Sequence, residues 1–452
     1  MNSSGHNTRG KISEIKERLV LQAIENRLKR LESQESKRPS DVSFLKKGGG
    51  VHGELAQWEN IPGFRKFSLM LQGAKKLGIK NPFFTCHEGT AGASTILCGR
   101  KMINFSNYNY LGLSGHPEVN EAAKKAIEQY GTSVSASRIV AGERALHQEL
   151  ERALADLHGA EAALTFVSGH ATTVTLIGHL FGPKDLVVHD ALIHNCAIEG
   201  IRLSGAKRMS FPHNDFQALD GILSDVRRHY DRVLVVVEGI YSMDGDYPDL
   251  PEFVAIKQKH HALLMVDEAH SIGVMGASGR GIAEHFGMES KDVDLWMGTL
   301  SKALGSCGGY VAGSASLIEY LKHSVPGFVY SVGMPPASCA AALKAIEIML
   351  REPKRTTILI QRGRKFLQDA QSAGIPTGSS SGMSVIPAIT GSSIRAARLS
   401  QEMSEQGISV QPILYPAVSE NSARLRFFIS SDHSEKDIYQ TIEVLSRLWK
   451  KG

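Results

Sequence analysis

Short apolar runs alternate with helical patterns through the middle of the chain, and this alternation limits the available folds more than any other feature. The run Val233-Leu234-Val235-Val236-Val237 is apolar at every position, as in a strand that is buried on both faces of a sheet. The predicted core strands span residues 162–167, 185–189, 207–211, 232–237, 262–266, 294–297 and 310–313. Because helical patterns fill most of the gaps, we expect an α/β fold: a mostly parallel, seven-stranded sheet with helices on both faces.

The rest of the sequence divides around this core. A polar stretch over residues 33–50, which contains Pro39 and ends in three glycines, is typical of a linker. The further predicted elements are helices over 11–32, 64–77 and 337–350 and a strand over 100–105. The expected domains are a helical extension and linker over 1–50, an N-terminal segment over 51–108, a large domain over 109–340 and a smaller C-terminal α+β domain over 341–452. The extension can dock a partner or mark a junction within a longer chain, and we favour the junction.

A single lysine lies in a loop of small residues, Gly298-Thr299-Leu300-Ser301-Lys302-Ala303-Leu304-Gly305, just after an apolar run. In a dry pocket beside other cations, a lysine loses its proton and can form a Schiff base with an aldehyde. The hydroxyls of Thr299 and Ser301 suit a phosphate. Taken alone, this octet is more often an ordinary surface loop.

An acid and a histidine follow the neighbouring predicted strand, 262–266, as Asp267 and His270. Ligands of open α/β sheets bind beyond the carboxyl ends of such strands. A carboxylate there can pair with a protonated pyridine nitrogen, and a histidine can hydrogen-bond a phenolate oxygen. An acid, a histidine and the lysine at consecutive strand ends therefore indicate a pyridoxal phosphate pocket.

Several further motifs occur in the order in which one enzyme family carries them. They are Asn109-Tyr110-Leu111-Gly112, Ser168-Gly169-His170-Ala171, Glu238-Gly239-Ile240-Tyr241-Ser242-Met243-Asp244-Gly245, Asp267-Glu268-Ala269-His270-Ser271-Ile272-Gly273 and Gly279-Arg280-Gly281, followed by the lysine loop. With these motifs the chain resembles the α-oxoamine synthases, pyridoxal phosphate enzymes with the aspartate-aminotransferase type of fold. The resemblance runs from about Asn104 to the C-terminus, and it looks strongest toward serine palmitoyltransferase-like and polyketide-synthase-associated members.

The resemblance implies contacts to the cofactor, residue by residue. The implied cofactor-binding residues are Gly169, His170, His194, Ser242, Asp267, His270, Thr299, Lys302 and Ser331. Gly169 and His170 would offer amides to the phosphate, helped by a helix dipole, and Thr299 would offer its hydroxyl. His194 would stack on the pyridine ring. Glu238 lies near the cofactor in relatives, although it can equally close its strand.

The resemblance also implies substrate contacts. Arg426 matches the family arginine that grips the substrate carboxylate, a task that suits a planar guanidinium, and Asn109 is also assigned to the substrate. Periodicity alone does not separate Arg426 from Arg424, for which the simpler interpretation is a solvated strand end. The sequence departs from the family at two places. Residues 131–142 lack the usual glycine-rich pattern. Val332 occupies a position where relatives have a threonine that contacts the phosphate of the neighbouring subunit, so Ser331 or backbone amides would make that contact here.

The family reaction is the decarboxylative condensation of an amino acid with an acyl thioester, which gives an α-amino ketone, carbon dioxide and free thiol. Lys302, His194 and Asp267 are the predicted catalytic residues. We expect an acyl-carrier protein of a polyketide-type pathway as the acyl donor, with a stand-alone acyl-coenzyme A-dependent enzyme similar to serine palmitoyltransferase as the nearest alternative. An aminotransferase and a non-catalytic partner subunit are the further alternatives, and the presence of Lys302 disfavours the latter.

The composition limits the compartment, the ligands and the partners that can be expected. The five cysteines are scattered without C-x-x-C spacing, so we expect free thiols in the cytoplasm and no metal site. The net charge of +5 is too mild to indicate nucleic acid, and no apolar run is long enough to span a membrane. The family implies a homodimer that shares pocket residues between subunits.

Overall fold

The computed structural model describes residues 57–451, which divide into two units between Phe84 and Thr85. In the first unit, a short 3-10 helix η3 (Trp58–Asn60) precedes helix α2 (Pro62–Lys76), which confirms the helix expected over 64–77. Pro62 suits the first helical turn because its missing N–H would have no partner there. The helix predicted over 11–32 and the linker over 33–50 lie outside the described residues.

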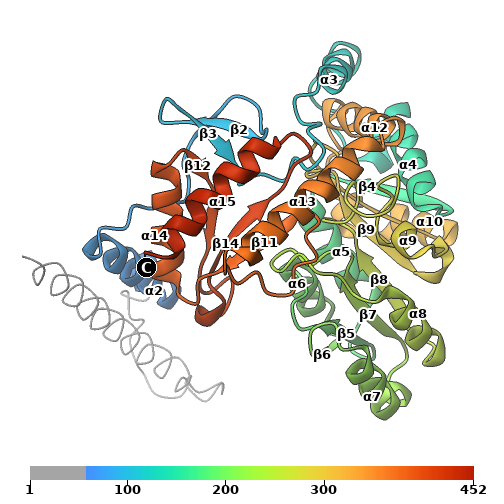
Figure 1. Cartoon of the computed structure of the whole chain (residues 1–452). Coiled ribbons are helices and arrows are strands. Elements are labelled where there is room, and N and C mark those ends of the chain that lie inside the picture. Colours follow the sequence, from blue (N-terminus) through green and yellow to red (C-terminus); the bar gives the residue numbers. More distant parts are fainter. Residues whose placement is uncertain (1–56, 452) are drawn as a thin grey trace, which may run out of the picture. The chain divides into compact units, whose positions relative to one another are not determined.

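A seven-stranded sheet forms the centre of the second unit (Figure 1). Its strands are β4 (Ala162–Phe166), β5 (Leu186–Asp190), β6 (Lys207–Phe211), β7 (Val233–Glu238), β8 (Leu263–Asp267), β9 (Leu295–Thr299) and β10 (Gly309–Gly313). They lie in the order β4-β10-β9-β8-β7-β5-β6, and only β10 runs antiparallel to its neighbours. The expected mostly parallel sheet is therefore confirmed, with strand ends within two residues of the prediction.

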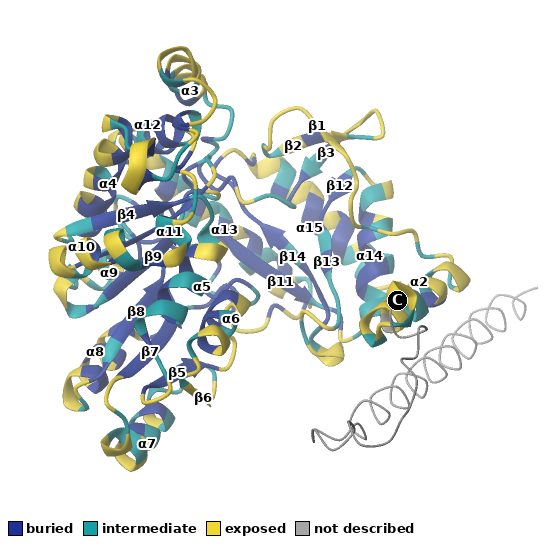
Figure 2. Cartoon of the chain, turned by 180° about the vertical axis from the view of Figure 1, so that it is seen from behind, coloured by how far each residue is buried: buried dark blue, intermediate teal, exposed yellow. Residues whose placement is uncertain are grey.

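Alternate side chains of each central strand enter different cores. In β7, Val235 and Val237 belong to a cluster on one face of the sheet, whereas Leu234 and Val236 belong to a second cluster on the other. This follows from the two-residue repeat of a strand, and it explains why the run is apolar throughout. Figure 2 shows the strands as buried and the outer helical surfaces as exposed.

Helices connect and cover the strands. They are α3 (Pro117–Tyr130), α4 (Ala145–His158), α5 (Gly169–Leu180), α6 (Asn195–Ser204), α7 (Phe216–Val226), α8 (Leu250–Lys259), α9 (Ile282–Phe286), α10 (Ala315–Ser324), α11 (Pro326–Val329) and α12 (Pro336–Arg351), with short turns η4 (Arg138–Gly142), η5 (Arg227–His229) and η6 (Ser290–Asp292). Helix α12 confirms the prediction over 337–350. Among the described residues, no helix combines the length and the apolar character that crossing a membrane requires.

Two smaller sheets complete the second unit. A three-stranded antiparallel sheet contains β11 (Val385–Ile389), β14 (Arg424–Phe428) and β13 (Gln411–Ile413) in that order. The other contains β1 (His87–Glu88), β2 (Ser94–Leu97), β3 (Arg100–Asn104) and β12 (Ile408–Ser409). The remaining elements are α13 (Lys354–Ser372), α14 (Ser393–Glu405), η7 (Glu420–Ser422) and α15 (Glu435–Trp449). Because β12 pairs with β3, the C-terminal part and the segment before residue 108 share a sheet.

Candidate active site

The carboxyl ends of β4, β5, β7, β8 and β9 lie at one edge of the large sheet, since these five strands run in the same direction. Each is followed by predicted site residues, in an arrangement typical of ligand sites in open α/β sheets. The register sets Glu238 beside Asp267, and Asp267 beside Met297, two residues before the end of β9.

Lys302 lies three residues beyond β9, and its Nζ is 5.7 Å from the centroid of the Tyr108 ring. Burial lowers the pKa of Lys302 to about 8, and the carboxylates of Asp267 and Glu238 oppose this shift. Within residues 57–451, no hydrogen bond or ion pair occupies its ammonium group. A substantial fraction of Lys302 is therefore neutral near pH 8 and available as a nucleophile or base.

Asp267 ends β8 with its carboxylate buried at the same edge. Its Oδ1 accepts a hydrogen bond from the Ala269 amide at 2.9 Å. Burial raises the pKa of Asp267, whereas the nearby Lys302 lowers it. A buried acid with so little compensation is suited to a cationic ligand atom.

The start of α5 packs tightly against the lysine loop. A Cβ atom on Gly169 would lie 2.8 Å from Oγ1 of Thr299, so only glycine permits this approach. Ser168 caps the helix by accepting the Ala171 amide, and Thr299 Oγ1 donates to the Gly308 carbonyl. The N-terminus of α5, which suits an anion, therefore lies beside Thr299, whose hydroxyl proton is directed to the Gly308 carbonyl in this structure.

His194 precedes α6, and the carboxylate of Glu238 fixes its backbone by accepting its amide at 2.7 Å. The same carboxylate accepts the Ser242 amide at 3.3 Å. Glu238 thus ties two predicted site residues together, and burial raises the pKa of its carboxyl well above normal. The side chain of His194 is open to solvent, but partial desolvation by the surrounding protein, together with the nearby Lys302, lowers its pKa and favours the neutral imidazole. His170 lies across from it, with the two ring centroids 6.3 Å apart.

His270, three residues beyond β8, is buried and contacts a residue whose role was not predicted. The hydroxyl of Tyr110 lies 2.7 Å from His270 Nδ1. Burial, reinforced by Lys302 and Arg426, lowers the pKa of His270 well below normal. Tyr110 belongs to a family motif, but no pattern in the sequence links it to His270, which is 160 positions away.

The two arginines of β14 have different environments. Arg424 is buried and donates to the Asp244 carboxylate at 2.6 Å and to the Met243 carbonyl at 3.0 Å. The interpretation of Arg424 as a solvated strand end was therefore wrong. Arg426 donates to the Ser242 carbonyl at 2.9 Å, but its buried Nε has no partner among the described residues. Its guanidinium, 4.6 Å from the Phe428 ring centroid, retains capacity for a carboxylate.

The structure does not present Asn109 to a substrate. Both donors of its side-chain amide are used, at 2.7 Å by the Ala91 carbonyl and at 3.3 Å by that of Ser114. Its Oδ1 accepts the Ser114 amide at 3.1 Å. The buried amide holds its own loop together, so its assignment to the substrate has no support in this geometry.

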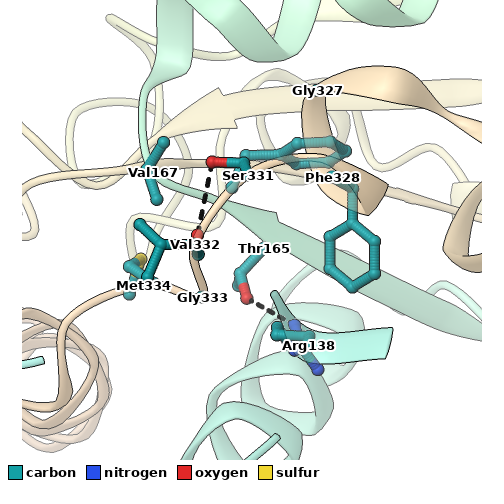
Figure 3. Close-up of a pocket in the computed structure, with 10 residues that line it drawn as sticks. Arg138, Thr165, Val167, Gly327, Phe328, Ser331, Val332, Gly333 and Met334 are labelled. Atoms are coloured by element: carbon teal, nitrogen blue, oxygen red, sulfur yellow. Dashed lines mark hydrogen bonds between the residues drawn. The ribbon is translucent and has the colours of Figure 1, made fainter. Parts of the chain in front are cut away.

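Ser331 lies in a loop that lines a small cavity with Arg138, Thr165 and Phe328 (Figure 3). Its hydroxyl donates to the Val332 carbonyl at 3.3 Å. The cavity holds about 10 Å³, which is close to the space of one water molecule. Arg138 is fully engaged there by Glu143, Glu151 and Thr165, so this part of the 131–142 segment is a packed support. A role of Ser331 toward a neighbouring subunit remains a prediction.

The residues at the sheet edge fit pyridoxal phosphate. The N-terminus of α5 at Gly169 suits the phosphate, the buried carboxylate of Asp267 suits the pyridine nitrogen, and Lys302 with its lowered pKa suits the aldehyde. The neutral His194 and His270 offer an aromatic face and a hydrogen-bonding nitrogen.

The comparisons agree with this arrangement. The family model described as aminotransferase class I and II matches residues 100–445. The 8-amino-7-oxononanoate synthase of Geobacter sulfurreducens is 40% identical over 383 residues, covering 84% of this chain and 97% of the relative. That of Thermoanaerobacter pseudethanolicus is 37% identical over 381 residues, covering 84% and 96%. A solved serine palmitoyltransferase from S. paucimobilis, with pyridoxal phosphate and myriocin bound, has a TM-score of 0.83 and 28% identity and covers 86% of this chain and 98% of its own.

Fold and site together define a pyridoxal phosphate-dependent enzyme of fold type I. Within the aminotransferase class I and II family, the chain belongs to the α-oxoamine synthases, which are C-acyltransferases.

Proposed function

We propose that this enzyme joins an amino acid to an acyl group carried by an acyl-carrier protein of a polyketide-type pathway in the cytoplasm. The net reaction releases the amino acid's carboxyl as carbon dioxide and the carrier as free thiol, and its product is an α-amino ketone. Bound pyridoxal phosphate supplies an aldehyde for a Schiff base and an electron-withdrawing ring.

Arg426 supports this proposal best, because it offers a binding group for the carboxylate of the amino acid. The half-buried Arg426 has a buried Nε without a hydrogen-bond partner among the described residues, which is costly unless a ligand completes its hydrogen bonds. Its neighbour Arg424 is paired with Asp244 and has no such need. The incoming amino acid carries the planar carboxylate that a guanidinium binds in bidentate fashion.

Lys302 has the properties of both anchor and base. Its pKa of about 8 leaves part of the Nζ groups without their extra proton near neutral pH, so Lys302 would hold the aldehyde of the cofactor and would serve as the base for the α-proton of the amino acid. Asp267 would pair with the pyridine nitrogen of the bound cofactor, and His194 would donate to the carboxylate of the amino acid or to the thioester carbonyl. His194 would stack on the ring of the bound cofactor, and the amides of Gly169 and His170 would hold its phosphate.

A basic helix supports a carrier-protein donor. Helix α2 contains Arg65, Lys66, Lys75 and Lys76 and no acidic residue, which suits an acidic protein partner. A second candidate, a stand-alone enzyme that uses acyl-coenzyme A, is favoured by the 8-amino-7-oxononanoate synthases and serine palmitoyltransferase among the similar proteins.

Steady-state kinetics with matched donors separate the two candidates. The same acyl chain is offered on a carrier protein and on coenzyme A, with Lys75→Glu/Lys76→Glu as the variant and Lys365→Glu, at an exposed position of α13, as the control. A carrier-dependent enzyme has a higher kcat/KM for the acylated carrier, and the α2 variant loses this advantage. Equal use of both donors by the unmodified enzyme would contradict the carrier proposal.

A further inference from the structure

The imidazole of His194 directs one ring nitrogen, Nδ1, toward the beginning of α6. Its Nδ1 lies 3.3 Å from the backbone N of Cys196 and 2.9 Å from Cys196 Sγ. Cys196 is buried, whereas His194 is open to solvent. Among residues 57–451, no partner is found for the other ring nitrogen, Nε2.

These contacts determine which nitrogen carries the proton. A backbone N–H can only donate, so Nδ1 of His194 must be the acceptor and the proton of the neutral ring resides on Nε2. The thiol of Cys196 then donates to the same Nδ1. Burial raises the pKa of Cys196 to about 12, so this thiol keeps its proton across the working pH range.

We propose that Cys196 is a positioning residue whose thiol holds His194 in the tautomer with Nε2–H directed toward the reacting groups. The tautomer itself follows from the contacts above, whereas its benefit to turnover rests on the proposed function of His194. Without the thiol, only the longer backbone hydrogen bond opposes the other tautomer, in which Nε2 has no proton to donate.

Three single variants isolate the thiol. Cys196→Ala removes the donor, and Cys196→Ser retains a donor of similar reach. Cys339→Ala is the matched control, because Cys339 is also buried with its pKa raised to about 12 but lies on α12, hydrogen-bonded to the Met334 carbonyl. All samples contain EDTA, because the ligand atoms of His170, His194 and Cys196 lie within 4.8 Å of one another and would hold a contaminating metal ion.

The first readout is solid-state NMR of protein labelled with ¹³C,¹⁵N-histidine, recorded both without and with the cofactor. The signal that disappears in His194→Asn is assigned to His194. The unmodified protein, Cys196→Ser and Cys339→Ala should show a single Nε2–H tautomer, and Cys196→Ala a mixture. The second readout is steady-state kinetics. In Cys196→Ala, kcat should fall about threefold to tenfold, with the KM for the amino acid little changed and the loss restored by serine.

Two results would overturn the positioning role: a single unchanged tautomer in Cys196→Ala, or equal losses of kcat in Cys196→Ala and Cys339→Ala. The proposed function can fail separately. If the unmodified enzyme forms no amino ketone from any donor, the proposed function is contradicted, whereas a tautomer mixture in Cys196→Ala would still support the positioning role of the thiol.

Discussion

Arg424 and Arg426 lie two residues apart on one face of β14, yet only Arg424 is paired with a carboxylate. The pair with Asp244, at 2.6 Å, satisfies the first guanidinium, and the buried Nε of the second lacks a partner among the described residues. The two arginines therefore have separate tasks, one in the fold and one toward a ligand.

This division predicts opposite effects of substitution. Arg426→Lys should raise the KM for the amino acid at least about tenfold, because a lysine cannot form the bidentate contact, with little change in Tm. Arg424→Ala should lower stability by about 2 kcal/mol, because it leaves the Asp244 carboxylate, which is only 13% exposed, without its partner, while the KM of the folded fraction stays near normal. Thermal denaturation and steady-state kinetics on both variants check this, and a large KM effect in Arg424→Ala alone would reverse the assignment.

Lys302→Ala should lower turnover at least about 100-fold, because the base is removed, and should abolish the visible absorbance of lysine-bound cofactor. Lys365→Ala, at an exposed ion pair with Asp369, is the control and should retain both. Full activity of the Lys302 variant would refute the role of Lys302 as anchor and base.

Cofactor loading should depend on pH through Lys302. Because its pKa is lowered to about 8, the rate at which the cofactor-free enzyme binds pyridoxal phosphate should rise with pH through about 8 and level off above it. Asp267 stabilises the ammonium form, so Asp267→Asn should move this midpoint to lower pH and reduce kcat about 100-fold. Stopped-flow absorbance measures the midpoint, and a shift to higher pH would exclude the proposed coupling of the two residues.

Gly169→Ala should weaken cofactor binding about tenfold, because the added methyl group would lie 2.8 Å from Thr299 Oγ1 and force the N-terminus of α5 away from Thr299. Gly182→Ala is the matched control, since nothing lies within 4 Å of its added methyl group. Fluorescence titration with pyridoxal phosphate compares the two, and equal affinities would show that the close approach at Gly169 is not needed.

The sequence predicted what depends on local pattern. Apolar runs such as Val233–Val237 identified the buried strands because both faces of the sheet are covered, and residues at strand ends could be placed together because parallel strands share an edge. Contacts between distant segments could not be predicted. Periodicity put Arg424 and Arg426 on one face, but only the position of Asp244 shows which is neutralised.

Asn109 and Tyr110 illustrate the same limit within one motif. The motif pointed to function at Asn109, whereas the fold uses both amide donors of that residue for its own loop. The next residue, Tyr110, contacts His270 across 160 positions. Likewise, the link from Glu238 to the His194 amide depends on the neighbouring positions of β5 and β7.

The most direct test of the central claim is carbon dioxide release with mass detection of the product, across the amino acids and a panel of short and long acyl thioesters. The account predicts carbon dioxide together with a product that retains the acyl chain and lacks the amino acid's carboxyl. Formation of a keto acid without carbon dioxide would contradict it and would indicate an aminotransferase.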